Sequence, residues 1–160
     1  MDDPAICGLD NSEDEAPAQN QLQHAYAIWV YLPKFKNAGN SWLPMKLATF
    51  KTVQEFWKIY QFMLRPSQME IGSQINIFWD GVEPTWEDET NKNGGRWQLK
   101  FNTHPNPNIT NKIWEDLLLA VIGEQFYYAN EITGLVVSLR KGKSIISIWN
   151  KHGKDQEIVT

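Results

Sequence analysis

The chain has 160 residues, a formal net charge of −4 and a single cysteine, Cys7. At this length we expect one domain that buries about two thirds of its unfolded surface without metals or disulfides. One cysteine excludes an intramolecular disulfide, and no apolar run approaches the roughly 20 residues of a membrane span. No secretion signal is recognisable either. We therefore expect a cytoplasmic protein, with the nucleus as a second compartment, and no membrane association.

The charge is distributed unevenly along the chain. The first 19 residues carry no base and six acids, which are Asp2, Asp3, Asp10, Glu13, Asp14 and Glu15. The remaining residues hold thirteen acids against fifteen bases, so they carry a small positive charge. We expect residues 1–20 to form an acidic, disordered tail with a solubilising role and residues 21–160 to form the folded domain. The acidic total therefore does not exclude a polyanionic ligand.

Hydrophobic periodicity predicts five or six strands and two helices. One helix begins at a capping box formed by Thr52 and Glu55 and ends before Pro66, and the other ends at Gly123 as a C-terminal cap. The chain stops at Thr160 within an apparent helix start, which we interpret as a shortened C-terminus. The expected elements, in chain order, are strand 25–32, strand 45–50, helix 53–64, strand 74–79, strand 96–101, helix 113–122, strand 132–139 and strand 144–149.

Most strands are joined by hairpin-length connections. This favours an α+β fold in which an antiparallel sheet carries both helices on one face and leaves the other face free. We expect the strands 74–79 and 96–101 to pair with each other across a long functional loop. We also expect Trp42, Trp86 and the turn at Arg140 to lie at one rim of the sheet.

The loop itself, residues 80–97 (DGVEPTWEDETNKNGGRW), is the most informative stretch. Burial of a large aromatic side chain is worth about 1.5–3 kcal/mol, so each of its two tryptophans needs a partner. We expect Trp97 to face the core, whereas Trp86 and Trp42 lie on loops where they can clamp a flat heterocycle. A carboxylate beside such an indole can accept two parallel N–H bonds from the edge of a guanine. Basic residues for phosphates follow at Arg96, Arg140, Lys141 and Lys143.

Enzymatic functions fit the residues less well. Three scattered histidines and one cysteine cannot build a tetrahedral zinc site, and no phosphate-binding loop or nucleophile elbow is present. We expect no cofactor, no metal and no catalysis. A glycosidase that uses a carboxylate pair from Glu83, Glu87, Asp88 and Glu89 stays open as an alternative. A carbohydrate-binding module and a scaffold that binds only proteins are further alternatives.

Four long motifs resemble the eukaryotic translation initiation factor 4E family of messenger-RNA cap-binding proteins. They are TVQEFW, FWDGVEPTWEDETNKNGGRW, WEDLLLAVIGEQF and GLVVSLR followed by Trp149. The resemblance runs from about Leu22 to Lys151. It implies a curved antiparallel sheet with helices on its convex face and the 7-methylguanosine cap of messenger RNA on its concave side, in a cap-binding domain of residues 21–160.

The resemblance also assigns individual roles in cap binding. Trp42 and Trp86 sandwich the methylated base, Glu87 binds its Watson–Crick edge and Trp149 approaches the N7-methyl group. Methylation gives the ring a positive charge, which strengthens stacking by a cation–π contribution of about 0.5–2 kcal/mol. The residues that reach the phosphates are Arg96 and Arg140, with Lys141 and Lys143 in the basic turn.

A second surface is implied on the helical side, for short helical motifs of factor 4G-like scaffolds and 4E-binding-protein-like repressors. The corresponding residues are Leu22, Val53, Trp57, Asp116, Leu119 and Gly123. The sequence departs from the family pattern at Asn20-Gln21 and at Glu115. We expect a monomer that acts in translation initiation. A cap-binding repressor of the homologous branch is the alternative, because Tyr26 and the segments MLRPS and IISIWNK resemble that branch.

Overall fold

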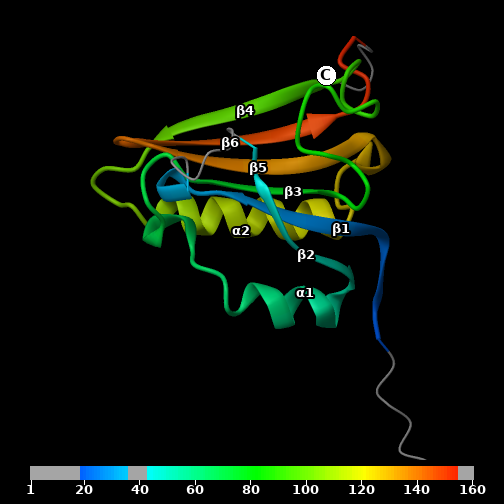
Figure 1. Ribbon diagram of the computed structural model, residues 1–160, viewed down its shortest axis with the longest axis horizontal. Coiled ribbons are helices and arrows are strands. Elements are labelled where there is room, and N and C mark those ends of the chain that lie inside the picture. Colours follow the sequence, from blue (N-terminus) through cyan, green and yellow to red (C-terminus); the bar gives the residue numbers. More distant parts are fainter. Residues whose placement is uncertain (1–18, 36–42, 155–160) are drawn as a thin grey trace, which may run out of the picture.

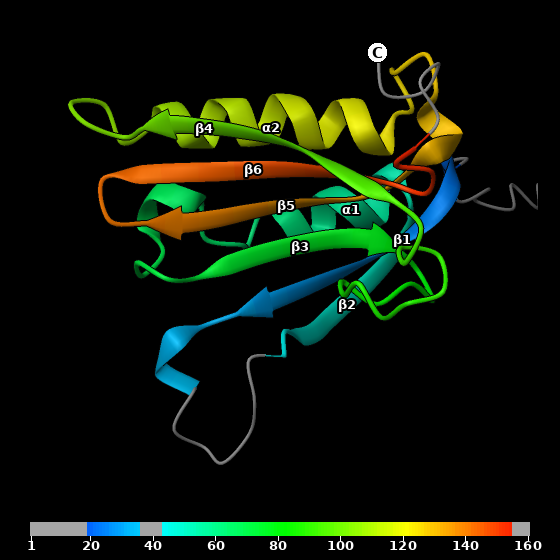
Figure 2. The same ribbon diagram turned by 90° about the horizontal axis from the view of Figure 1, so that it is seen from above.

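The computed structural model describes residues 19–35 and 43–154, which form one six-stranded antiparallel sheet with two α-helices on one face (Figure 1). The strand order is β2-β1-β3-β5-β6-β4, and Figure 2 shows the strands in this sequence. The elements are β1 (Gln21–Tyr31), η1 (Pro33–Phe35), β2 (Met45–Thr52), α1 (Val53–Tyr60), η2 (Pro66–Gln68), β3 (Gln74–Trp79), β4 (Gly95–Asn102), α2 (Ile109–Ile122), η3 (Ala129–Glu131), β5 (Ile132–Arg140) and β6 (Lys143–Asn150).

The predicted fold class is confirmed: a curved antiparallel sheet carries both helices on one side. No helix among the described residues is long and apolar enough to cross a membrane. Residues 1–18 of the predicted tail, the indole of Trp42 and the helix start expected at 155–160 lie outside the described residues.

An aromatic core fills the space between the sheet and the helices. Tyr26 and Phe50 stack at a centroid distance of 5.7 Å, and Phe56 and Tyr60 stack at 5.0 Å. Trp114 of α2 is fully buried in the same cluster. Truncation of such a residue to alanine typically costs about 3–5 kcal/mol, so this cluster fixes which face of each strand points inward.

The helix α1 begins where it was predicted and ends earlier. The hydroxyl of Thr52 accepts a hydrogen bond from the Glu55 amide at 3.1 Å, and the Glu55 carboxylate accepts from the Lys51 amide at 2.8 Å. Expected to continue to residue 64, the helix ends at Tyr60 because the Arg65 guanidinium donates to the Tyr60 carbonyl at 3.0 Å and stacks on its ring at 4.0 Å. The chain leaves the helix through tighter turns, in which the amides of Phe62 and Met63 donate to the carbonyls of Ile59 and Tyr60 at 3.1 Å.

Tyrosine hydroxyls tie α1 and β1 to α2. Tyr60 donates to the Glu115 carboxylate at 3.1 Å, and Tyr26 donates to the Val121 carbonyl at 3.3 Å. Burial, followed by the nearby Glu124 charge, raises the pKa of Tyr26 to about 12. Burial also raises the pKa of Tyr60, which Arg65 partly opposes. Both hydroxyls therefore stay protonated donors at neutral pH, and Glu115, a departure from the family pattern, joins the two helices.

Two expectations about strand arrangement are wrong. The strands β3 and β4 do not pair; β3 lies between β1 and β5, and β4 pairs with β6 at the edge of the sheet. The Arg140 turn also lies at the opposite end of the strands from the Trp86 loop (Figure 2). Both errors concern which distant segments pair, and local pattern does not determine this.

Two elements begin earlier than predicted. The strand β1 starts at Gln21, which pairs with Thr52. The mostly polar segment 21–24 was not predicted to be part of a strand. The helix α2 starts at Ile109, four residues before the predicted start, and buried Thr110 in this first turn shares a hydrogen bond of 2.9 Å with Ser144 of β6. In both places pairing with a distant segment outweighs weak local propensity.

Gly134 of β5 allows a close aromatic contact in the middle of the sheet. It pairs with Phe78 of β3, and a Cβ atom at this position would lie 2.4–2.6 Å from three carbons of the Phe78 ring. The ring therefore lies directly over the β5 backbone. From there it makes an edge contact with Trp149 at a centroid distance of 5.4 Å.

We expect Gly134→Ala to lower the free energy of unfolding by about 1–3 kcal/mol, the usual cost of overpacking. In a Phe78→Ala background the same change should cost much less, because the ring that the new methyl group meets is gone. Urea denaturation of the four proteins measures this coupling. Equal costs in both backgrounds would show that the contact is not the cause.

Candidate functional site

The face of the sheet away from the helices, called the open face below, carries polar and charged side chains in register. Strand alternation places these residues opposite the core. Across β3, β5, β6 and β4 they form four rows: Phe78, Gly134, Trp149 and Arg96; Asn76, Val136, Ser147 and Gln98; Gln74, Ser138, Ile145 and Lys100; and Arg140, Lys143 and Asn102. Successive rows are about 7 Å apart, since each strand residue advances about 3.4 Å.

An aromatic stack stands on the first row. Trp86, from the loop after β3, lies on Trp149 with the ring centroids 3.9 Å apart and an angle of 28° between the planes. Phe78 supports Trp149 from below, and the Arg96 guanidinium lies 5.5 Å from the centroid of Trp86 and 5.9 Å from that of Trp149. Trp149 is 5% exposed and Trp86 is 40% exposed, so the outer face of Trp86 is available to a flat ligand.

Buried hydrogen bonds hold the loop that carries Trp86. The Asn91 amide donates to the carbonyls of Glu83 at 2.9 Å and Thr85 at 3.0 Å, and its oxygen accepts from the Thr133 hydroxyl at 3.0 Å. Both carboxylate oxygens of Asp88 accept backbone amides, from Glu83 at 2.9 Å and Thr90 at 2.8 Å. Sequence reasoning gave Asn91 no role, because nothing in its neighbours marks it as buried.

Glu87 follows Trp86 at the exposed part of this loop. Within residues 19–35 and 43–154 its carboxylate has no hydrogen-bond or ion-pair partner, in contrast to the carboxylates of Asp88 and of Glu89, which pairs with Lys92. Of the three successive acids, only Glu87 thus keeps both oxygens available to a ligand beside the indole.

Several cations on the open face have no carboxylate partner among residues 19–35 and 43–154. Arg96, Lys100 and Arg140 line a groove of ≈ 340 Å³ that runs along the rows and also reaches Trp149. None of the groove-lining residues in the described part of the chain is an acid. Lys100 was missed by sequence reasoning, although the polar alternation of Arg96, Gln98 and Lys100 could have indicated it. Lys141 lies in the β5–β6 turn, and Lys143 opens β6 in the fourth row.

The predicted second surface lies on the helices. Tyr60 and Glu115 join α1 to α2, and Trp57 and Leu119 each lie about one helical turn from this bond. Trp57 is 42% exposed and Leu119 is 36% exposed, which makes them accessible apolar side chains on adjacent helices. Val53 and Gly123 continue the two rows by another turn.

Leu22 and Asp116, the other two residues predicted for this surface, are not exposed apolar side chains. Leu22 is partly buried against the core, and Asp116 is exposed and pairs with Lys112 at 2.9 Å. The end of α2 next to Gly123 is fixed by His24, whose Nδ1 lies 2.5 Å from the Glu124 carboxylate. Gly123 is the cap as predicted, but the left-handed residue is Glu124, with a φ of 50°.

Trp97 lies on the core side of β4 but is not buried, contrary to expectation. It is 51% exposed at the wall of a cavity of ≈ 370 Å³ on the helical side, beside Phe126, Tyr128 and Ile148. The cavity is lined by residues of the segment between α2 and β5, and no residue of α2 itself lines it. The side chain points to the helical side as alternation requires, but the cavity leaves half of it exposed.

A curved antiparallel sheet with an aromatic stack, a free carboxylate and unpaired cations on its open face defines a ligand-binding protein. A family model described as Eukaryotic initiation factor 4E matches residues 21–160. The rice (Oryza sativa subsp. japonica) protein named eukaryotic translation initiation factor NCBP is 28% identical over 171 residues, which cover 99% of this chain and 74% of the relative. The chain belongs to the eukaryotic initiation factor 4E family.

Solved structures agree with this assignment. Ascaris suum eIF4E-3 in complex with m7G cap has a TM-score of 0.82 and 30% identity, covering 89% of this chain and 79% of its own. Caenorhabditis elegans eIF4E-3 in complex with the 4E-binding protein Mextli has a TM-score of 0.80 and 28% identity. The match covers 89% of this chain and 81% of the Caenorhabditis chain. The chain spans 74% of the length of the rice relative and 47% of the length of a Triticum aestivum relative with the same name.

We expect Asn91→Ala to lower the free energy of unfolding by about 1–3 kcal/mol, because two carbonyls and the Thr133 hydroxyl lose a buried partner. Hydrogen exchange of the amides in residues 83–93 should accelerate, since the loop loses its attachment to β5. Asn93→Ala, in the same loop but with an exposed side chain, is the matched control. Unchanged exchange in Asn91→Ala would mean that other contacts hold the loop.

Proposed function

We propose that the chain binds the 7-methylguanosine cap of messenger RNA on the open face of its sheet and acts in translation initiation. The observation that carries the proposal is the half-exposed indole of Trp86, with the free carboxylate of Glu87 beside it and unpaired cations along the adjoining groove. Membership of the family and the m7G cap complex of the Ascaris relative support it.

Each chemical part of the cap has a receptor in this arrangement. The cationic base stacks on the outer face of Trp86, a contact worth about 1–3 kcal/mol, and Trp42 closes the sandwich from the other side. Glu87 accepts the N–H groups of the Watson–Crick edge. Arg96 and Arg140 bind phosphates. A neutral guanine lacks the cation–π contribution, so the site prefers the methylated base.

The stack of Trp86 on Trp149 blocks the access of the N7-methyl group to Trp149. Trp149 is covered by Trp86. For Trp149 to approach the N7-methyl group, the Trp86 indole has to rotate away from it, which its half-exposed side chain permits while hydrogen bonds hold the loop backbone in place. Loss of the stack costs about 0.5–1.5 kcal/mol, which the bound base offsets by stacking on the same indole.

We also propose that this chain binds its ligand without catalysing a reaction. A glycosidase needs two available carboxyl groups on either side of a sugar. Both oxygens of Asp88 accept backbone amides and Glu89 pairs with Lys92, so neither is placed to act with Glu87. This argues against the glycosidase alternative. The cations of the groove favour a phosphorylated ligand over an uncharged sugar.

We propose that partner proteins dock on the two helices. Trp57 and Leu119 present exposed apolar side chains on the two helices, which is the pattern that an amphipathic helix recognises. The Caenorhabditis relative in complex with the 4E-binding protein Mextli supports partners of this class. The partner surface and the cap site lie on opposite sides of the sheet (Figure 1).

Titration with 7-methyl-GTP should quench tryptophan fluorescence at lower concentration than titration with GTP. Glu87→Gln should weaken 7-methyl-GTP binding about 10-fold or more, because a charge-assisted hydrogen bond is worth about 1.5–3 kcal/mol. Glu89→Gln removes one acid from the same loop and should change the affinity by roughly two-fold at most. Equal affinity for GTP and 7-methyl-GTP would refute cap binding.

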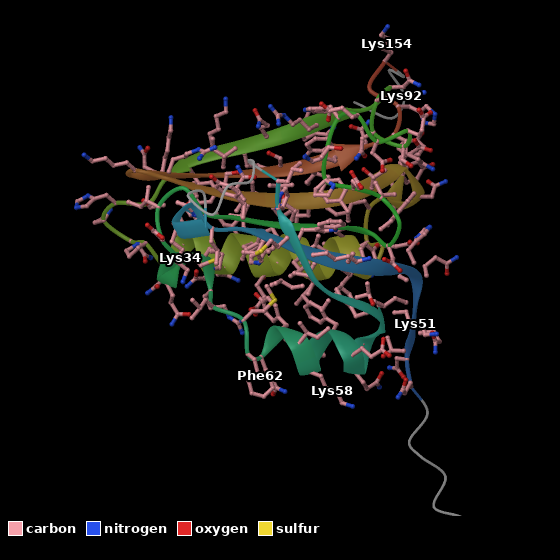
Figure 3. All side chains as sticks on the ribbon, viewed as in Figure 1. Lys34, Lys51, Lys58, Phe62, Lys92 and Lys154 are labelled. Atoms are coloured by element: carbon pink, nitrogen blue, oxygen red, sulfur yellow. The ribbon has the colours of Figure 1, made fainter. Side chains whose placement is uncertain are left out.

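Trp57→Ala should weaken binding of a helical 4E-binding-protein peptide by about 2 kcal/mol or more, as expected for an aromatic hot spot. Affinity for 7-methyl-GTP should not change, because Trp57 is on the helical side. Phe62→Ala is the control, since this neighbouring aromatic is 84% exposed beyond the end of α1 (Figure 3). Calorimetry with the peptide measures both; an equal loss in the two variants would argue against a specific groove.

A further inference from the structure

The first part of β1 leaves the regular pairing of the sheet. Gln21 pairs with Thr52, but the next paired residue, Tyr26, lies opposite Phe50, so β1 advances five residues where β2 advances two. On its other side, the pairing of β1 with β3 starts only at Tyr26. The segment 22–25, called the arm below, therefore bulges out of the ladder and depends on other contacts to fix it.

His24 fastens the arm to the end of α2. The arm faces the helical side, where Leu22 packs against the core. The Nδ1 atom of His24 lies 2.5 Å from a carboxylate oxygen of Glu124, the residue that follows the cap Gly123. The imidazole also stacks on Trp79 of β3, with a centroid distance of 4.3 Å and an angle of 10° between the rings. We call His24, Glu124 and Trp79 the clasp.

Glu124 has a backbone conformation that favours glycine. Its φ is 50°, in the left-handed region, at a position where helices usually end on glycine. A side chain is disfavoured there because its Cβ atom comes close to a carbonyl oxygen. The contact with His24 offsets part of this cost. The clasp therefore stabilises the way in which α2 ends, and with it the backbone at Gly123.

The arm bridges the two helices of the predicted partner surface. Before the arm, the chain is tied to α1, because the Val53 amide donates to the Asn20 carbonyl at 2.9 Å. At the other end, the contact between His24 and Glu124 ties the arm to α2. Leu22, a predicted partner contact, lies between these two attachments. Its position therefore depends on both of them.

We propose that His24 is a positioning residue for partner binding, which holds the arm and the end of α2 in the arrangement that a helical partner peptide recognises. The inference rests on the proposed function, which assigns the helical side to partners. His24 acts through Glu124 and Trp79 and needs no contact with the peptide. It fixes Leu22 and Gly123 before binding, so that less conformational entropy is lost when the peptide docks.

The test measures the binding of a helical 4E-binding-protein peptide and of 7-methyl-GTP by calorimetry. His24→Ala should weaken peptide binding roughly 3- to 10-fold, since the arm and the helix end must then be ordered during binding. Affinity for 7-methyl-GTP should not change, because the Asp80 amide still donates to the Ala25 carbonyl at 2.8 Å and holds the base of the Trp86 loop.

A matched control is available in the same chain. His152 forms the other histidine–carboxylate pair, with its Nδ1 atom 2.6 Å from Glu131, and neither residue belongs to the predicted partner surface. His152→Ala should therefore leave the peptide affinity unchanged.

Two further variants separate positioning from a general loss of stability. His24→Arg keeps a planar cation that can pair with Glu124 and stack on Trp79, so it should restore most of the peptide affinity. Glu124→Gly removes the carboxylate and gives the left-handed position the residue that it favours. In this background His24→Ala should weaken peptide binding much less, because its partner in the clasp is already gone.

Unchanged peptide affinity in His24→Ala would overturn the inference. An equal loss of peptide and 7-methyl-GTP affinity would do so too, because it would indicate general destabilisation. An undiminished effect of His24→Ala in the Glu124→Gly background would show that the clasp is not the cause. If the unsubstituted chain fails to bind the peptide, the proposed partner surface fails separately. The clasp is then judged by hydrogen exchange of the Leu22 and Glu124 amides, which must accelerate in His24→Ala and not in His152→Ala.

Discussion

Packing of the helices against β1, β3 and β5 commits one side of each strand to the core. The aromatic cluster of Tyr26, Phe50, Phe56, Tyr60 and Trp114 cannot turn outward without losing several kcal/mol per side chain. Because the strand period is two, the residues between these core positions must then face away from the helices. Both surfaces of the protein follow from this: exposed apolar residues remain on the helices, and the cations and Trp149 stand together on the open face.

The site is joined to the sheet at one short segment of β5. The Thr133 hydroxyl fixes Asn91 and so the loop that carries Trp86, while Gly134 admits the Phe78 ring that supports Trp149. Two successive residues of one strand thereby position both indoles of the stack. This attachment leaves Glu87 and the outer face of Trp86 exposed without leaving their backbone loose, which is the preorganisation that tight ligand binding requires.

Strand and helix positions could be predicted from periodicity, and the capping residues of α1 could be predicted from spacing. Pairing could not. The strand β4 follows β3 in the chain, but it pairs with β6, roughly fifty residues later, and so becomes an edge strand. Trp97 has the alternation of a core residue and is nevertheless half exposed for this reason. The end of α1 at Tyr60 was likewise set by the Arg65 side chain, a contact that propensity does not encode.

The sequence by itself determined the chemistry at the ligand: an indole followed by a carboxylate in a loop closed by Arg96, and helical positions for Trp57 and Leu119. Only the tertiary structure decided which acids are free, because Asp88 and Glu89 are distinguished from Glu87 by their hydrogen bonds and not by their type. It also brought Lys100, Arg140 and Lys143 onto one face. The physical reason is that strand register depends on hydrogen bonding and packing across the whole sheet, which no local stretch of sequence contains.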